Sequence, residues 1–181
     1  MWQIHRVFGP RAPGVGAVLF LVIAIAVLVF DGDDDQGGDE RGGSGGAGRE
    51  AATVAVTDVV DGDTIHALVD GEDESVRYIG IDTPEVDPSI GVECFGKEAS
   101  ARNKTLVADE RVRLVFGAER RDRYGRLLAY VYVGDVFVNA EIVRGGYART
   151  LEIEPNTQRA PLLNRLEQDA ANAGRGLWGA C

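Results

Sequence analysis

Residues 53–85 read TVAVTDVVDGDTIHALVDGEDESVRYIGIDTPE. Short apolar runs in this stretch alternate with polar residues, and turn-forming Asp and Gly residues separate one run from the next. This pattern predicts three strands, over Thr53–Val60, Thr64–Val69 and Val76–Ile81. The first part of the folded chain is therefore expected to consist of short strands joined by tight turns.

The chain beyond residue 85 supplies further strands and helices. Alternating apolar residues predict strands over Arg111–Phe116 and Leu127–Val133. Helical spacing of apolar residues predicts helices over Lys97–Ala108, Asn139–Arg144 and Thr157–Ala173. Five short strands, with one helix between the third and fourth and helices after the fifth, favour a mainly β, α+β fold. We expect a five-stranded Greek-key barrel of the oligonucleotide-binding (OB) type with three helices.

Length and charge limit the class of protein. The chain has 181 residues, enough for one compact domain with appendages. Its 29 acidic and 19 basic residues give a formal net charge of −10. A strongly basic domain, the usual mark of a nucleic-acid-binding protein, is absent, so any such role has to rest on a local patch. The acidic, lysine-poor composition fits either a protein kept soluble in concentrated salt or the residue bias of a GC-rich genome.

An apolar segment near the N-terminus predicts a membrane anchor. Val15–Phe30 reads VGAVLFLVIAIAVLVF, and with the residues just before it the apolar segment spans 12–30, which is just long enough to cross a bilayer. Arg6 and Arg11 precede the segment and aspartates follow it. The positive-inside bias then predicts a cytoplasmic N-terminus over residues 1–11, with the rest of the chain outside. Because no small-residue cleavage site ends the segment, we favour a signal anchor over a cleaved signal peptide.

Residues 31–50 differ in composition from everything that follows. They read DGDDDQGGDERGGSGGAGRE, a Gly- and Asp-rich stretch with almost no apolar residue. Such a stretch has too little apolar surface to offset the entropy cost of ordering, which predicts a disordered linker. The acidic cluster at its start lacks the spacing and the final glutamate of an EF-hand calcium loop. The folded domain is therefore expected to span residues 51–181.

Cys94 and Cys181 are the two cysteines of the chain. If the domain lies outside the cytoplasm, a pair of cysteines favours a disulfide bond between them. Closing a loop of that length is worth about 4 to 5 kcal/mol in the chain-entropy model. Two unpaired thiols are the alternative.

Acidic residues gather at two predicted strand ends. Residues 61–64 (DGDT) form the turn between the first two strands, and residues 82–85 (DTPE) follow the third. Either motif alone is typical of an ordinary turn or strand end. Together they bring carboxylates to the ends of neighbouring strands, where Asp63 and Asp82 can converge on a hard cation. Oxygen ligands of this kind favour calcium over zinc.

Two arginines accompany these acids. Arg77 lies five residues before Asp82, so in a regular strand the two side chains point to opposite faces and share a site only through a bulge or through barrel curvature. Arg126 lies just before the fifth strand. Two guanidinium groups beside a cation hold a phosphate and neutralise the charge that develops on it during displacement at phosphorus. The pattern is therefore compatible with a phosphodiesterase.

The motifs also resemble those of a known family. In order and spacing, five runs are similar to the staphylococcal nuclease (thermonuclease) family, and the resemblance extends over about residues 51–178. These runs are DGDT (61–64), VRYIGIDTPE (76–85), GVECFGKEAS (91–100), DRYGRLLAYVY (122–132) and VNAEIVRGG (138–146).

The resemblance implies a fold, an activity and a metal. Members of that family are five-stranded OB barrels with three helices that hydrolyse DNA and RNA with calcium and leave 3′-phosphates. By motif, Asp63 and Asp82 correspond to calcium ligands through their carboxylates, and Thr83 through its backbone carbonyl. The implied partners are DNA and RNA as substrates and Ca²⁺ as cofactor.

The resemblance also implies catalytic and substrate-binding roles. Glu85 corresponds to the general base for the attacking water. Arg77 and Arg126 correspond to the residues that bind the scissile phosphate, one of them stabilising the transition state. Tyr124 corresponds to a further substrate-binding residue.

This sequence departs from the family pattern in two places. The paired tyrosines that the family places after its second helix, where they stack on a base and touch its phosphate, have no counterpart in Thr150–Asn156. Cys94 lies in a loop where cysteine is not a general family feature, which supports a disulfide to Cys181 at the C-terminus.

These observations lead to one expectation and one alternative. We expect a membrane-tethered nuclease acting outside the cytoplasm, or a secreted one if the apolar segment is cleaved. The alternative is a catalytically silent OB module that binds nucleic acid or a protein ligand. We expect a monomer without an obligate protein partner.

Overall fold

The computed structural model describes residues 51–89 and 91–181. The N-terminal segment (1–11), the expected anchor (12–30) and the expected linker (31–50) lie outside the described residues. Within the described part of the chain, no helix is long and apolar enough to cross a membrane.

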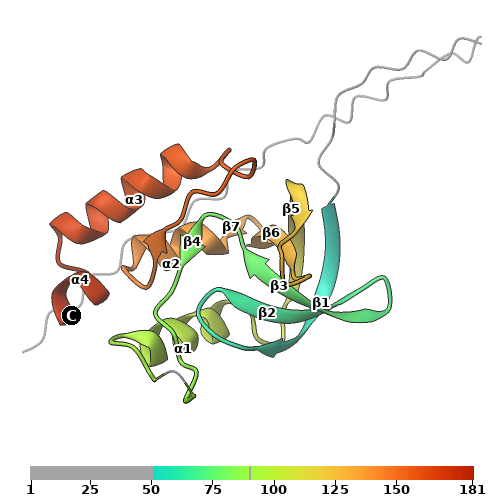
Figure 1. Cartoon of the computed structure of the whole chain (residues 1–181), viewed down its shortest axis with the longest axis horizontal. Coiled ribbons are helices and arrows are strands. Elements are labelled where there is room, and N and C mark those ends of the chain that lie inside the picture. The colour runs from blue at the N-terminus through green and yellow to red at the C-terminus, as the bar shows by residue number, and fades with distance from the viewer. Residues whose placement is uncertain (1–50, 90) are drawn as a thin grey trace, which may run out of the picture. The chain divides into compact units, whose positions relative to one another are not determined.

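The core of the domain is a closed barrel of five strands (Figure 1). Its strands follow the order β3-β2-β1-β5-β6, all neighbours being antiparallel, and a parallel pairing between β3 and β6 closes the barrel. A short strand, β7, extends the sheet beyond β6. The bounds are β1 Ala51–Val59, β2 Thr64–Val69, β3 Glu72–Tyr78, β5 Arg111–Arg121, β6 Leu127–Val133 and β7 Val136–Phe137.

Helices and a second small sheet complete the domain. In Figure 1, α1 lies at one end of the barrel, while α2 and α3 lie together on the side away from β1. Strand β4 pairs with β8 in a separate two-stranded sheet. The bounds are α1 Gly96–Val107, α2 Val138–Arg144, α3 Ala160–Asn172, α4 Leu177–Ala180, β4 Ile81–Asp82 and β8 Arg149–Thr150.

The apolar faces predicted from the alternating pattern meet inside the barrel. Ile65, Val76, Leu114 and Leu127 are among the fully buried side chains, and they come from four different strands. At about 1.5 to 3 kcal/mol for each large apolar side chain removed from water, this core accounts for most of the driving force for closure. The expected five-stranded OB barrel with three principal helices is confirmed, and α4 is an additional short helix.

Several element boundaries differ from those expected. The third strand was expected over Val76–Ile81, but β3 begins at Glu72 and ends at Tyr78. Gly80 follows with φ of +83°, a backbone conformation that glycine adopts without the steric cost of a side chain, and the chain turns there into β4. The third helix begins at Ala160 rather than Thr157, because Pro161 suits the first turn of a helix but not its interior.

Two buried asparagines attach helices to the barrel. Asn103 of α1 accepts a hydrogen bond from the Tyr78 hydroxyl (3.0 Å) and donates one to the Asp61 carbonyl oxygen (2.8 Å). Asn139 of α2 accepts a hydrogen bond from the Val131 amide (3.0 Å) and donates to the Ile79 carbonyl oxygen (2.9 Å). Asn103 thereby fixes α1 to the turn between β1 and β2, and Asn139 fixes α2 to β6 and to the turn between β3 and β4.

Candidate active site

Asp63 is the buried centre of an acidic cluster. Its carboxylate is fully buried and accepts hydrogen bonds from the Thr83 amide (2.6 Å) and the Thr83 hydroxyl (2.9 Å) at Oδ2. The Thr64 hydroxyl donates to Oδ1 (3.2 Å), which also forms an ion pair with Arg77. A buried carboxylate is stable only with such partners. They connect the turn before β2 to the segment after β4.

Arg77 joins Asp63 to Asp82. Its Nη2 atom donates to Asp82 Oδ1 (2.6 Å) and to the Ile81 carbonyl oxygen (3.3 Å), while Nη1 pairs with Asp63. In a regular strand Arg77 and Asp82 would point to opposite faces. They meet because β3 ends at Tyr78 and the chain turns at Gly80, which returns Asp82 to the face that carries Arg77.

Further acids surround this arginine. The pKa of the exposed Glu85 is raised, mainly by partial desolvation of its carboxyl and then by the negative charge of Asp61. Asp82 and Glu93 raise it slightly further, while the positive charge of Arg77 lowers it. Burial likewise raises the pKa of Asp61, although Arg77 opposes it. Desolvation is the largest cause of both shifts, and it disfavours the charged form of these carboxyls unless a positive charge lies beside them.

The donors at this site fit a hard divalent cation. Asp63, Asp82 and Glu85 offer carboxylate oxygens, and Thr83 offers its backbone carbonyl oxygen. An all-oxygen set of this kind suits calcium. In the described part of the chain, no three acidic, His or Cys side chains are already grouped closely enough to hold a metal ion. The Arg77 guanidinium lies between the carboxylates of Asp63 and Asp82 instead.

Arg126 is oriented by a tight turn that begins at Asp122. The Asp122 Oδ1 atom accepts hydrogen bonds from the amides of Tyr124 (2.9 Å) and Arg126 (3.0 Å), and its Oδ2 atom accepts one from Arg126 Nε (2.7 Å). Gly125 closes the turn with φ of +87°. The Nε bond directs the end of the Arg126 side chain, and Tyr124 lies exposed next to it with its ring 5.5 Å from the guanidinium carbon.

Both arginines line a cavity of about 460 Å³. The polar part of its wall includes Arg77 and Arg126, and the aliphatic part comes from β6, from the segment after β8 and from Ile79 and Ile81. Asn156 holds that segment to β5 through two hydrogen bonds with the backbone of Glu119 (2.9 and 3.1 Å). Other lining residues include Tyr124, Leu128, Leu151 and Ile153.

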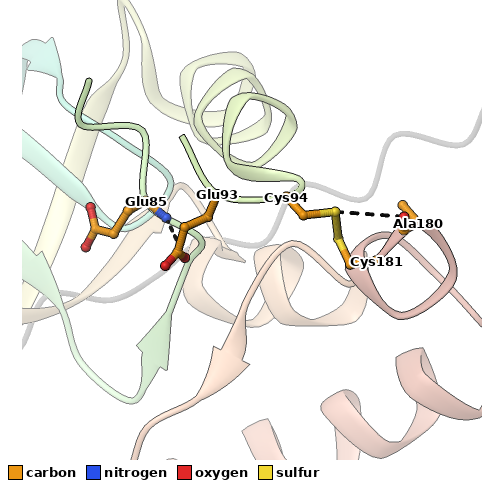
Figure 2. The surroundings of a disulfide bond; sticks show 5 residues. All are labelled: Glu85, Glu93, Cys94, Ala180 and Cys181. Atoms are coloured by element: carbon orange, nitrogen blue, oxygen red, sulfur yellow. Dashed lines mark hydrogen bonds between the residues drawn. A yellow bond between two sulfur atoms is a disulfide. The ribbon is translucent and has the colours of Figure 1, made fainter. Parts of the chain in front are cut away.

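The other end of the acidic cluster is connected to the C-terminus. Figure 2 shows Glu85 and Glu93 side by side, with the adjacent Cys94 joined to Cys181 by a disulfide bond. The two Cα atoms of the disulfide are 6.0 Å apart.

The structure brings some of the expected site residues together directly and others only through the cavity. Hydrogen bonds and ion pairs join four of the expected residues into one cluster: Asp63, Asp82, Thr83 and Arg77. Glu85 lies close enough for the charges of Arg77 and Asp82 to affect its pKa. Arg126 and Tyr124 belong to a separate turn and line the same cavity as Arg77.

The sequence reasoning assigned no role to four residues of this region, Asp122, Glu93, Leu151 and Ile153. Asp122 had a usable signal, because an aspartate that begins a turn ending in Gly commonly bonds to the following amides. No local pattern marks the other three.

An OB-type barrel that places acids beside two arginines at one cavity is compatible with a hydrolase of phosphate esters. Comparison with known proteins identifies the family. Residues 75–180 match the family described as staphylococcal nuclease homologue. The chain belongs to the staphylococcal nuclease family, and it is a nuclease, a phosphodiester hydrolase.

Individual relatives agree with this assignment. The thermonuclease of Staphylococcus intermedius is 38% identical over 162 residues, which cover 89% of this chain and 95% of the relative. The SPbeta prophage-derived endonuclease YokF of Bacillus subtilis is 41% identical over 133 residues, 72% of this chain and 45% of the relative. Endonuclease YncB of the same organism is 38% identical over 133 residues, 72% of this chain and 63% of the relative.

Proposed function

We propose that the protein is a calcium-dependent endonuclease that hydrolyses DNA and RNA and leaves 3′-phosphate ends. The observation that carries the proposal is the position of Arg77, which lines the cavity together with Arg126 and at the same time contacts the acids Asp63 and Asp82. A phosphate bound by both arginines therefore lies next to the all-oxygen cluster that suits calcium.

The chemistry is assigned to residues that reach this phosphate. Arg77 and Arg126 bind the scissile phosphate and neutralise the charge that grows on its oxygens in the transition state. Glu85 accepts the proton of the attacking water. Its raised pKa supports this role, because a base works best when its pKa approaches the operating pH. The oxygen of the water bonds to phosphorus, the bond from phosphorus to the 5′ oxygen breaks, and the leaving oxygen takes up a proton.

Calcium, when bound, supplies positive charge next to the phosphate and favours ionisation of the attacking water. Asp63, Asp82 and the Thr83 carbonyl are the groups proposed to hold it. Because Asp63 is also bonded to Thr83 and to Arg77, the same carboxylate aligns the metal site with the phosphate site.

The cavity is proposed to hold a nucleoside next to that phosphate. Its aliphatic wall offers apolar contact to a base, and the exposed Tyr124 beside Arg126 offers a ring for stacking. These contacts do not distinguish one base from another, so we propose little sequence preference.

We further propose a monomeric enzyme that is anchored by residues 12–30 and faces outward from the cell, or is released if that segment is cleaved. The charge asymmetry around the apolar segment supports this topology, and so does the disulfide, since such bonds persist in oxidising compartments. Protease added to intact cells should release the domain by cutting within residues 31–50. Protection of the domain from the protease contradicts the topology.

The catalytic proposal is tested with the purified full-length protein in detergent. Plasmid DNA and a structured RNA are each incubated with calcium, with magnesium and with a chelator. A product that a polymerase extends from its 3′ end only after phosphatase treatment carries a 3′-phosphate. Calcium-dependent cleavage of both substrates to 3′-phosphate ends is expected. Cleavage that is unaffected by the chelator, or products with 5′-phosphates, contradicts the proposal.

A further inference from the structure

Glu85 is held through its backbone by one partner. The Glu85 amide donates to Glu93 Oε2 (3.1 Å), and the Glu85 carbonyl oxygen accepts from the Glu93 amide (2.8 Å) (Figure 2). We call this pair of hydrogen bonds the Glu85–Glu93 clasp. Both ends of the clasp lie on the surface, since Glu85 and Glu93 are exposed. Apolar packing therefore contributes little to holding the proposed base.

The segment that carries the clasp adopts an unusual backbone conformation. Phe95 has φ of +69°, in the left-handed region that a phenylalanine seldom occupies, and its ring stacks on Tyr147 at 5.4 Å. Gly96 follows, and a Cβ atom there would lie 2.6 Å from the Glu85 carbonyl oxygen. The start of α1 thus presses closely against the backbone of Glu85, in a conformation that persists only if the surroundings hold it.

The disulfide provides that hold from the C-terminal side. Cys94 follows Glu93 directly and is bonded to Cys181, the residue after α4. Helix α4 is itself fixed, because Leu177 is buried and its amide donates to the Gly146 carbonyl oxygen (2.9 Å). The disulfide therefore attaches the exposed clasp to α4, which is held against the loop after α2.

We propose that the Cys94–Cys181 disulfide and the Glu85–Glu93 clasp together are a positioning device for the Glu85 carboxylate. With the disulfide intact, Glu93 stays in place and fixes the backbone of Glu85 beside the phosphate site. With the bond severed, the segment around Cys94 moves away from the barrel and the carboxylate loses its alignment with the attacking water. The inference rests on the proposed role of Glu85 as base. The effect falls on the chemical step, because the phosphate-binding arginines lie elsewhere.

The first test compares the oxidised full-length protein with the double variant Cys94→Ser/Cys181→Ser, with detergent and calcium present and at a temperature well below the unfolding transition of both. We expect kcat to fall by about tenfold to a hundredfold, the size typical of a misplaced catalytic group, while KM changes by less than about threefold. Dithiothreitol, which closes to its own cyclic disulfide as Cys94 and Cys181 become thiols, should reproduce this loss in the wild type. It should have no effect on the double variant.

Two comparisons separate positioning from simple stabilisation. Val69→Ala, which shortens a core side chain at the end of β2 away from the acidic cluster, should lower the unfolding temperature and leave kcat unchanged.

Glu93→Ala should reduce kcat as the double cysteine variant does, whereas Glu93→Gln, whose amide oxygen still accepts from the Glu85 amide, should recover most of it. Combining Glu93→Ala with the cysteine substitutions should add little further loss, because both act by the same route.

Hydrogen exchange gives a readout that does not depend on activity. The Glu85 amide should exchange faster in the double cysteine variant than in the wild type, while amides of β2 keep their protection. Two results would overturn the inference and leave the nuclease assignment unaffected. One is an unchanged kcat in the double cysteine variant. The other is a loss of kcat in that variant no larger than the loss in a Val69→Ala protein with the same unfolding temperature. If the oxidised wild type shows no calcium-dependent cleavage, both the proposed function and the inference fail.

Discussion

Arg77 donates from Nη2 to Asp82 Oδ1 at 2.6 Å, although the two residues are five positions apart on a stretch that reads as one strand. The same guanidinium pairs with the buried Asp63. One side chain therefore links the acids proposed to hold calcium with the cavity proposed to hold the substrate.

Metal dependence is the first expected outcome. Activity should be high with calcium, much lower with magnesium, which demands stricter octahedral geometry, and lost on chelation. Rates of plasmid cleavage measured at equal free metal concentrations check this ranking. Equal rates with calcium, with magnesium and with chelator contradict an oxygen-ligand calcium site.

Replacing either proposed catalytic residue should abolish most of the activity. Glu85→Gln and Arg126→Ala should each lower kcat/KM by about a hundredfold to a thousandfold or more, because water activation and transition-state charge each contribute a few kcal/mol. Glu85→Gln should leave folding nearly unaffected because the side chain is exposed, whereas Arg126→Ala also loses the bond to Asp122 and should lower stability by about 1 kcal/mol. Glu98→Gln on α1 and Arg165→Ala on α3 are matched controls, being exposed side chains that do not line the cavity. A cleavage rate within about tenfold of wild type for either catalytic variant would falsify the assigned role.

Asp122→Asn should weaken both activity and stability. The substitution removes the acceptor of the Arg126 Nε bond but keeps an oxygen for the two turn amides, so we expect a decrease in kcat of about tenfold. The pKa of Asp122 is affected most by burial, which raises it, but the hydrogen bonds from Arg126 and Tyr124 and the Arg126 charge together outweigh burial and lower it.

The sign of this shift sets the pH dependence. A carboxyl whose pKa is lower in the folded state stabilises the fold fully above its ordinary value of about 3.9 and ceases to do so as pH falls through the folded-state pKa. Urea unfolding should therefore show wild type more stable than Asp122→Asn by about 1 kcal/mol at pH 6, with the difference shrinking as the pH falls below about 3.9 and through the lowered folded-state pKa. A difference that stays constant from pH 6 into the acid range where Asp122 is protonated shows that the charge is not responsible.

Aromatic side chains in the aliphatic wall should tighten substrate binding. Leu151→Tyr or Ile153→Tyr places a ring in the cavity that bears Arg77 and Arg126. Base stacking contributes about 1 to 3 kcal/mol, so KM for a short oligonucleotide should fall by about fivefold or more. Leu162→Tyr, at a similarly exposed apolar position on α3, is the control and should leave KM unchanged. If KM rises in both cavity variants, the cavity does not accept a base.

Much of the fold follows from local pattern. Alternating apolar residues located the cores of all five barrel strands, including Ile65 and Leu127, because side chains of a strand alternate between its two faces. Helical spacing located α1 and α2 to within a residue or two. The end of the third strand was misplaced, because Ile79 and Ile81 extend the apolar run across the turn at Gly80.

The sequence by itself determined which chemistry the site can contain: carboxylates after two strands, arginines in two motifs and a pair of cysteines. Only the tertiary structure decided which of these groups meet. Arg77 reaches Asp82 because the chain turns at Gly80, Glu93 holds Glu85 because the start of α1 presses on its backbone, and Leu151 joins the cavity because β8 pairs with β4. Strand and helix patterns depend on neighbours along the chain, whereas these contacts depend on barrel closure and on the packing of segments far apart in sequence.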